Sequence, residues 1–170
     1  VMDLFLSRNK VGIKGIKENK KWNLVLKNLN NKKKKLFNNY LNKKIDKNCF
    51  LELKKIKKKL SLSNEEIATR KASNIAINLL QKKMQFLMDG SADLTESNLT
   101  KADKQKTFSS SNYKGTYINY GIREHAMAGA MTGISLHGGL IPYGGSFLIF
   151  TDYCKQSIRL AKIMKQKVIY

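Results

Sequence analysis

Cysteine, proline and acidic residues are scarce in this chain of 170 residues, which has two cysteines, one proline and 12 aspartates and glutamates. Cys49 and Cys154 lie far apart and show no metal-ligand spacing, so the pattern predicts reduced thiols and no metal site. A run of about 18 apolar residues, which a membrane span needs, is absent. The start at Val1 shows no apolar core of a signal peptide. We therefore expect a cytoplasmic protein without a membrane partner.

Positive charge is abundant but unevenly distributed. The 33 lysines and arginines against 12 acidic residues give a formal charge of +21. Residues 1 to 60 hold 19 basic and 4 acidic residues (+15), and residues 61 to 170 hold 14 and 8 (+6). Such an excess raises the question of nucleic acid. However, the lysine runs at 32 to 35 and 57 to 59 have few aromatic platforms between them, and the same segment is crowded with asparagine, as in compositional drift.

The first 60 residues are lysine-rich and only intermittently apolar. We expect residues 1 to 60 to be a linker with one or two amphipathic helices and few contacts with the rest. The pattern changes at Ser61, where we place the start of a domain over residues 61 to 170. A capping box at residues 63 to 66 predicts the start of a helix that runs over residues 64 to 82.

Apolar runs and helical periods alternate after this helix. The segment from Leu140 to Ser146 contains Pro142 and the pair Gly144-Gly145, and we expect it to be rich in turns. The remaining expected elements are neighbouring parallel strands at 84 to 89, 116 to 120 and 168 to 170, and helices at 122 to 137 and 147 to 165. This alternation predicts the α/β class, with an incomplete parallel sheet and flanking helices.

Three stretches carry candidate chemistry. Glu124 lies in the first turn of an otherwise apolar helix, where it either complements the helix dipole or serves a function. Three aromatic residues at intervals of three form one surface, which suits core packing or a ring-binding wall. They are Phe147, Phe150 and Tyr153. The loop at residues 90 to 100 is rich in hydroxyls and carboxylates just after a strand, and such loops cap helices or bind ligands.

Four strings resemble transketolase in the same order and at matching separations, from about residue 65 to the end of the chain. They are ATRKAS at 68 to 73, GSADLTESNLT at 90 to 100, YGIREHAM at 120 to 127 and PYGGSFLIFTDY at 142 to 153. The resemblance implies the first half of the domain that binds the aminopyrimidine ring of thiamine diphosphate. It also implies transfer of a two-carbon ketol unit from ketose phosphates to aldose phosphates in the pentose phosphate pathway.

The resemblance assigns the catalytic role to Glu124, which corresponds to the glutamate that hydrogen-bonds ring nitrogen N1' of the cofactor. Sharing a proton there favours the imino tautomer, whose exocyclic nitrogen can deprotonate the thiazolium carbon. By the same resemblance Phe147, Phe150 and Tyr153 line the pyrimidine pocket, with Phe150 stacked on the ring. His125 is expected to be structural.

Further positions follow from the same family. Asp93 and Leu94 correspond to a loop that approaches the thiazolium from the neighbouring subunit, which implies a homodimer with the site at the subunit interface. Arg70 and Ser97 correspond to the pair that binds the phosphate of the sugar substrate, a use that suits a guanidinium group and a hydroxyl.

The family's diphosphate and magnesium strings have no match in this chain. We therefore expect Mg²⁺ to be held by a preceding domain, and we expect the fragment alone to be inactive. Related thiamine-diphosphate enzymes remain open, namely dihydroxyacetone synthase, deoxyxylulose-phosphate synthase and the 2-oxo-acid dehydrogenases. A lysine-rich nucleic-acid-binding protein is the alternative of a different class, although we expect no nucleic-acid partner.

Overall fold

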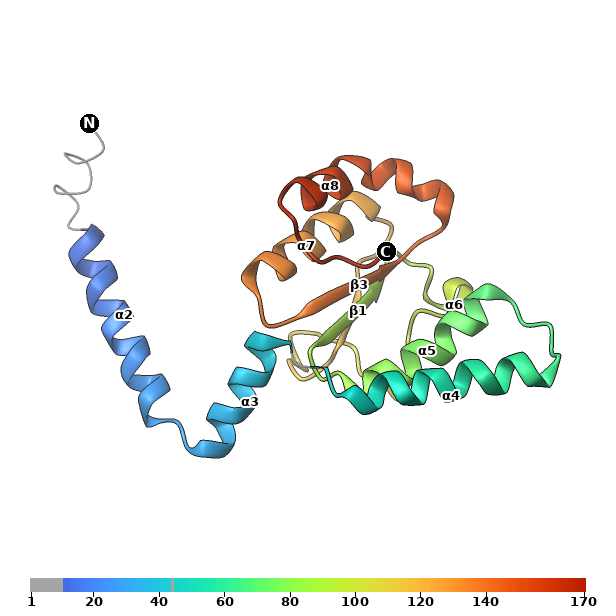
Figure 1. The fold of residues 1–170 in the computed structure, drawn as a ribbon. Helices are drawn as coiled ribbons and strands as arrows, with labels where there is room; N and C mark the ends of the chain where they lie inside the picture. The colour runs from blue at the N-terminus through green and yellow to red at the C-terminus, as the bar shows by residue number, and fades with distance from the viewer. Residues whose placement is uncertain (1–10, 44) are drawn as a thin grey trace. The chain divides into compact units, whose positions relative to one another are not determined.

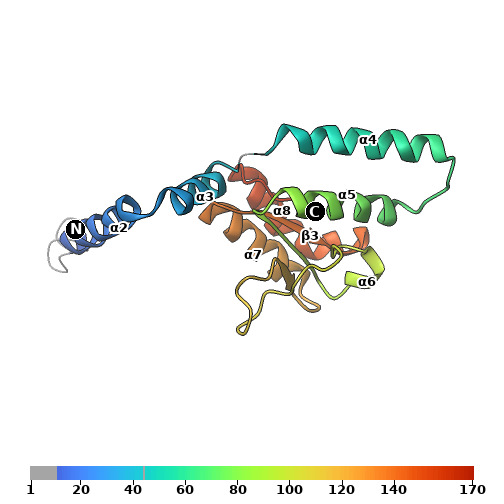
Figure 2. The same ribbon diagram turned by 90° about the horizontal axis from the view of Figure 1, so that it is seen from below.

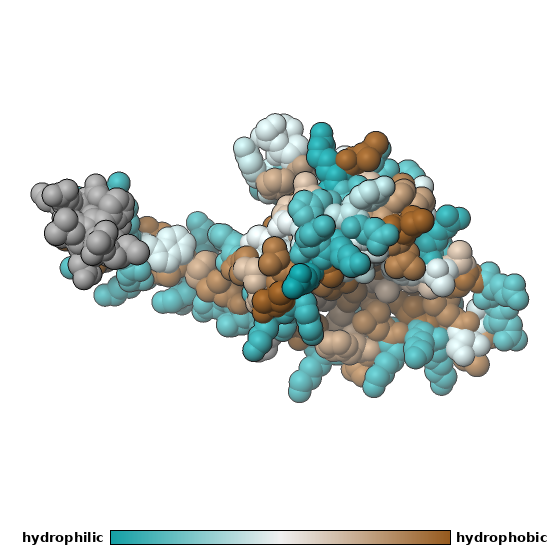
Figure 3. Space-filling model, turned by 90° about the horizontal axis from the view of Figure 1, so that it is seen from above, coloured by the Kyte–Doolittle hydropathy of each residue, from teal (hydrophilic) through white to brown (hydrophobic). Residues whose placement is uncertain are grey.

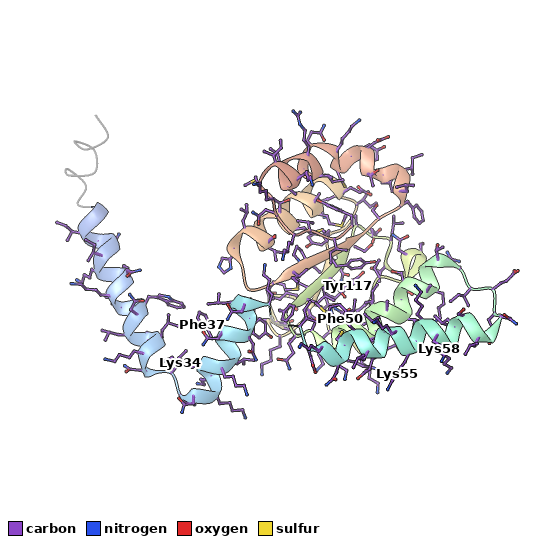
Figure 4. The ribbon with its side chains drawn as sticks, in the orientation of Figure 1. Lys34, Phe37, Phe50, Lys55, Lys58 and Tyr117 are labelled. Atoms are coloured by element: carbon purple, nitrogen blue, oxygen red, sulfur yellow. The ribbon has the colours of Figure 1, made fainter. Side chains whose placement is uncertain are left out.

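The structure is a computed structural model that describes residues 11–43 and 45–170 (Figure 1). The chain divides into two compact units, Val1–Asn39 and Tyr40–Tyr170. The first unit contains helix α2 (Val11–Asn28) and most of helix α3 (Asn31–Asn42). Within it, the rings of Trp22 and Phe37 meet edge to face with centroids 6.1 Å apart, and Figure 4 labels Phe37 on α3.

The second unit begins with two helices that pack side by side, α4 (Lys47–Ser63) and α5 (Thr69–Lys83) (Figures 1 and 2). Cys49 of α4 is fully buried, and Glu52 forms an ion pair with Lys83 of α5 at 2.7 Å. The expectation that the segment before Ser61 makes few contacts is therefore wrong for its last third. The three described helices before residue 64 also exceed the expected one or two.

The start of α5 differs from the predicted capping box. Ser63 is the last residue of α4, and its hydroxyl donates to the carbonyl of Leu60 at 3.0 Å. Asn64 ends α4 in the left-handed conformation, with a φ of 50°. An asparagine with positive φ ends a helix and does not start one, so no helix begins at residue 64, and α5 begins at Thr69.

Three parallel strands form the sheet, β1 (Leu87–Ser91), β2 (Tyr117–Asn119) and β3 (Ile141–Gly145), in the order β2-β1-β3. Strand β1 lies centrally, and four of its five residues are buried. Asp89 is paired in register with Tyr117 on one side and Tyr143 on the other. The predicted strands at 84 to 89 and 116 to 120 exist, although β1 begins three residues later than predicted.

Strand β3 corrects the prediction of a turn-rich segment from Leu140 to Ser146. Residues 168 to 170 pair with β3 through a parallel bridge between Tyr143 and Ile169, so β3 separates them from β1. Pro142 is tolerated because only its carbonyl is needed there, as the acceptor for the amide of Ile169 at 3.1 Å. Gly144 supplies space, since an added Cβ would lie 2.3 Å from the sulfur of Met131.

Helices cover both faces of the sheet (Figure 1). Helix α5, backed by α4, lies on one face. On the other lie α7 (Glu124–His137) and α8 (Thr151–Ile163), which contact each other, while α7 also packs on β3. A short 3-10 turn η1 (Leu148–Phe150) precedes α8, and a four-residue helix α6 (Thr95–Asn98) follows β1. The predicted fold class is confirmed.

The core has a separate cluster on each face. The α5 side gathers Met84, Phe86 and Leu87, against which Tyr40 and Ile45 also pack. The α7 side gathers Ala92, Met127 and Met131. Figure 4 labels Tyr117, which is fully buried. The first cluster lies at the amino end of β1 and the second at its carboxyl end, so the central strand is held at both ends.

Candidate active site

The loop after β1 is anchored to the neighbouring strand. The hydroxyl of Ser91 donates to the carbonyl of Gly145 at 2.9 Å and accepts from the amide of Leu94 at 3.2 Å. Asp93 is exposed between them and has a φ of 60°, a conformation that costs energy for a residue other than glycine. The structure therefore presents the Asp93 carboxylate at the carboxyl edge of the sheet.

A buried tyrosine holds both ends of α6. The Tyr117 hydroxyl lies 2.8 Å from the hydroxyl of Thr95 and 2.9 Å from that of Thr100. Burial raises the pKa of Tyr117, and its hydrogen bonds to the two threonines oppose this. The amide of Asn74 on α5 also donates to the carbonyl of Leu99 at 2.9 Å. The segment that carries Asp93 and Ser97 is thus fixed by hydrogen bonds to β2 and to α5.

Glu124 is the first residue of α7 and is only 8 % exposed. Among the residues that the structure describes, its carboxylate makes no hydrogen bond or ion pair. Its backbone carbonyl accepts from the thiol of Cys154 on α8 at 3.2 Å. Burial raises the pKa of the Cys154 thiol, and the charge of Glu124 raises it further. Cys154 is therefore a neutral hydrogen-bond donor that fixes the start of α7 against α8.

The three predicted aromatic residues form one continuous surface at the start of α8. The Phe147 and Phe150 rings are 5.8 Å apart with an interplanar angle of 32°, and the Phe150 and Tyr153 rings are 6.0 Å apart at 36°. Phe147 is 41 % exposed and Tyr153 is 63 % exposed, so the outer rings are not core residues. Tyr153 directly precedes Cys154, which places this surface beside the start of the helix that carries Glu124.

A cavity of about 420 Å³ lies at the carboxyl ends of β1 and β3. Arg70 lines it and donates from Nη1 to the backbone carbonyl of Ser97 at 3.3 Å, so the structure brings this predicted pair together. Leu148 and Thr151 line the cavity, whereas the aromatic rings of Phe147 and Phe150 do not. The aromatic surface and the cavity are therefore two separate parts of the candidate site.

Two cavity residues were missed by the sequence analysis. The Nδ2 atom of Asn98 and the hydroxyl of Ser146 are buried and have no hydrogen-bond partner in the described part of the chain. Such groups are uncommon and mark positions where a polar ligand or water completes the bonding. Both residues lie within the strings that carried the resemblance, at 90 to 100 and 142 to 153, and this was the available signal.

The predicted residues therefore fall into three groups. Glu124 lies near the aromatic surface, and Arg70 contacts Ser97. Asp93 and Leu94 lie on the loop after β1, which leaves the sheet next to β2, because the amide of Tyr120 donates to the carbonyl of Ser91 at 3.0 Å. His125, expected to be structural, is exposed and lies 3.4 Å from the hydroxyl of Ser157.

Residues 11–43 and 45–170 include no group of three or more histidine, cysteine, aspartate or glutamate side chains that could hold a metal ion. No helix among them combines the length and apolarity that a membrane crossing requires.

The polar loops and the cavity of this domain lie at the carboxyl ends of its parallel strands. This arrangement is typical of ligand-binding α/β domains, and the domain falls into that class. A family model described as "Transketolase, pyrimidine binding domain" matches residues 65–170. This match covers more than half of the chain, and the chain belongs to the transketolase pyrimidine-binding domain family.

Individual relatives agree with this assignment. The chain is 50% identical over 114 residues to a transketolase of Cereibacter sphaeroides, which covers 67% of the chain and 17% of that protein. It is 39% identical over 160 residues to a transketolase of Rhodobacter capsulatus, covering 94% of the chain and 24% of that protein. The chain thus spans between a sixth and a quarter of the length of these relatives.

Solved structures show the same fold. The transketolase from Leishmania mexicana matches with a TM-score of 0.76 and 33% identity over 92% of this chain and 23% of that one. The transketolase of Pichia stipitis in complex with sedoheptulose-7-phosphate matches with a TM-score of 0.78 and 30% identity, over 94% of this chain and 24% of that one.

Proposed function

We propose that this chain is part of a thiamine-diphosphate-dependent transketolase, which transfers a two-carbon ketol unit from ketose phosphates to aldose phosphates. The observation that carries the proposal is Glu124, a carboxylate that is 8 % exposed and has no partner among the described residues. Its carboxylate oxygens remain accessible at the start of α7, so a ligand placed there can share a proton with them. The named relatives are transketolases, so the related thiamine-diphosphate enzymes are not favoured.

The aromatic surface fits an aminopyrimidine ring. Phe150 is half-buried between Phe147 and Tyr153, whose partly exposed rings offer flat faces for stacking. In this proposal the rings hold the pyrimidine and exclude water, and Glu124 shares a proton with ring nitrogen N1'. The cofactor, when bound, supplies the carbon nucleophile that the protein itself lacks.

Arg70 and Ser97 are proposed to bind the substrate phosphate. The guanidinium group of Arg70 donates one N–H to the carbonyl of Ser97. This bond orients the guanidinium group and leaves its other N–H donors available. Asn98 and Ser146 add an unpartnered amide and hydroxyl to the same cavity. This set of donors suits the phosphate and hydroxyl groups of a sugar phosphate.

A homodimer is proposed because apolar side chains reach the surface beside the aromatic residues. Leu148 is 86 % exposed, Ile149 is 72 % exposed and Leu160 is 54 % exposed. Figure 3 shows brown apolar side chains among hydrophilic ones on the side that carries α7 and α8. Leu148 and Ile149 are neighbours in the chain, and large exposed apolar side chains that lie together mark protein interfaces. In such a dimer Asp93 and Leu94 would approach the thiazolium of the partner subunit.

The remaining expectations are also proposals. Residues 1–60 would serve as a linker and residues 61–170 as the pyrimidine-binding domain, although α4 packs on α5 across this boundary. Mg²⁺ would be bound together with the cofactor's diphosphate by another domain of the enzyme. The enzyme would act in the cytoplasm, in the pentose phosphate pathway.

Replacement of Glu124 by glutamine tests the proposal. In the protein expressed from its complete coding sequence, with saturating thiamine diphosphate and Mg²⁺, we expect Glu124→Gln to lower kcat by about 10²- to 10⁴-fold, because glutamine cannot share the proton. The matched control is Glu96→Gln, an exposed carboxylate on α6, which should leave kcat unchanged. Near-normal ketol transfer and near-normal exchange of the thiazolium proton in Glu124→Gln would defeat the assignment.

A further inference from the structure

A second cavity lies at the opposite, amino-terminal end of the sheet. It has a volume of about 270 Å³ and is bounded by the end of α5 and by the loop that leads into β2. Thr116, which directly precedes β2, forms part of its wall. Its lining shares no residue with the cavity that contains Arg70.

Four lysines surround this second cavity, Lys82, Lys104, Lys106 and Lys114, with Asp103 as the acidic residue of its lining. Their charges sum to +4 and −1, or +3, which is half of the +6 carried by residues 61 to 170. All four lysines are exposed, and none forms an ion pair within residues 11–43 and 45–170. Four lysines against one carboxylate leave a net repulsion between the ammonium groups, and an anion between them reduces that repulsion.

The wall between the lysines consists of amides that are held in place. The Nε2 of Gln105 donates to the carbonyl of Thr116 at 3.1 Å, and its Oε1 accepts from the amide of Ala102 at 2.9 Å. The Nε2 of Gln81 donates to the buried carboxylate of Asp89 at 2.8 Å. The cavity thus combines a fixed polar wall with flexible cationic side chains at its rim.

The chemistry of this lining selects the kind of ligand. A cation would meet four ammonium groups, and an apolar molecule would displace water from polar side chains without replacing its hydrogen bonds. The volume is just below the usual range for drug-sized ligands, which favours a small molecule. Asp89 lies behind Gln81 and Gln105, both of which donate to its carboxylate, so their amides stand between that charge and the cavity.

We propose that this cavity, lined by Lys82, Lys104, Lys106 and Lys114, binds a small phosphate-bearing anion. The site is separate from the candidate active site, because one lies at the amino ends and the other at the carboxyl ends of the strands. It does not rest on the proposed ketol transfer, and its ligand need not be the sugar substrate.

Titration with inorganic phosphate, followed by NMR on the full chain labelled with ¹⁵N, tests the proposal. Ionic strength is held constant with sodium chloride, so that general charge screening does not change. We expect saturable shifts of the side-chain amide signals of Gln81 and Gln105. The absence of saturable shifts at these two side chains would overturn the proposal.

A matched pair of triple variants separates the site from general charge. Lys104→Gln/Lys106→Gln/Lys114→Gln removes three charges at the cavity, and we expect phosphate to bind at least about tenfold more weakly. Lys54→Gln/Lys55→Gln/Lys58→Gln removes three charges from the exposed surface of α4, where Figure 4 labels Lys55 and Lys58, and should leave binding unchanged. Equal weakening in both triples would overturn the proposal.

If Lys104→Gln/Lys106→Gln/Lys114→Gln does not fold, single variants and a variant that retains the charge test the same proposal. Lys106→Gln and Lys114→Gln should each weaken binding about two- to threefold, since each removes one of several exposed charges. Replacement of the same three lysines by arginine retains the charge and should retain binding. Loss of binding in the arginine triple, with unchanged backbone signals, would contradict an electrostatic site.

Discussion

On one face of the sheet, the apolar side chains of Met127 and Met131 of α7 close over Gly144, and Glu124 lies at the start of the same helix. On the other face, Asp89 lies fully buried between Tyr117 and Tyr143. One of its carboxylate oxygens is bonded to Gln81 and Gln105, and the other has no partner in the part of the chain that the structure describes. The comparison teaches that the same strands are stabilised in two ways. We expect volume changes to dominate the α7 face, and protonation and hydrogen bonding to dominate the α5 face.

The largest expected effect is that of Met131→Ala on the α7 face. Met131 is fully buried, so its truncation removes apolar contacts and leaves a cavity, which should lower the free energy of unfolding by about 2 to 5 kcal/mol. Urea denaturation of the full chain measures this. Leu136→Ala on the same helix is the control, because Leu136 is 50 % exposed and should lose much less. Equal losses in the two variants would contradict the tight packing described for this face.

Asp89→Asn should stabilise the protein at neutral pH. Burial raises the pKa of Asp89 from 3.8 to about 6, against the opposing hydrogen bonds from Gln81 and Gln105. Below pH 3.8 Asp89 is protonated in both the folded and the unfolded protein, and its contribution to the free energy of unfolding is fully present. This contribution is lost as the pH rises through about 6, because the buried carboxyl group then ionises. Above that pH the ionised carboxylate costs up to about 3 kcal/mol, and the neutral amide avoids this cost.

Unfolding free energies of Asp89→Asn and of the unmodified chain should therefore diverge between pH 4 and pH 7.5. Their difference is expected to be near zero at the lower pH and largest at the higher one. The exposed Asp103 provides the control, since Asp103→Asn should show no such divergence. A pH-independent difference for Asp89→Asn would show that its carboxylate stays ionised throughout.

Gly144→Ala should have an intermediate effect on the α7 face. The added methyl group would lie 2.3 Å from the sulfur of Met131, so this buried side chain must move within the packed core, and we expect a loss of about 1 to 3 kcal/mol. Gly133→Ala, on the exposed side of α7, is the matched control. An added Cβ at Gly133 meets nothing within 4 Å, and alanine should stabilise the helix by about 0.5 to 1 kcal/mol. Thermal unfolding should move in opposite directions in the two variants.

Tyr117→Phe should produce the smallest change. The variant keeps the buried ring but removes the hydroxyl shared with Thr95 and Thr100, which should cost about 1 kcal/mol. The double variant Tyr117→Phe/Thr100→Val removes both partners of one of these bonds and should recover part of the loss. If Tyr117→Phe were as costly as Met131→Ala, the two faces would not differ as described.

Much of the fold could be predicted because its elements follow local periodicity. The apolar run before Asp89 and the alternation of strands and helices predicted a parallel α/β domain, which the structure confirms. Strand β3 was missed because Pro142 and Gly144 are turn residues by local propensity, and their suitability depends on Met131 and Ile169, which are distant in sequence. The start of α5 was misplaced because the capping pattern at Ser63 coincided with the end of a preceding helix.

The candidate site was predictable only in part. The strings at 90 to 100 and 120 to 127 pointed to Glu124 and Asp93, whose roles remain predictions. The hydrogen bond between Arg70 and Ser97 and the burial of Glu124 needed coordinates, because they join segments that local patterns do not relate. The missing partner of the Asn98 amide could not be recognised from sequence, because it depends on the burial of that side chain at the end of α6.

Asn74 limits how fast the wall of the cavity that contains Arg70 can open. Its side-chain amide donates to the carbonyls of Leu99 and Lys101, which binds the segment after α6 to the middle of α5. That segment cannot open unless α5 also separates from it, and backbone amides around Leu99 should therefore exchange with solvent almost as slowly as those of the core. A ligand would then meet a preformed cavity, and its association rate would be limited by diffusion and not by loop opening.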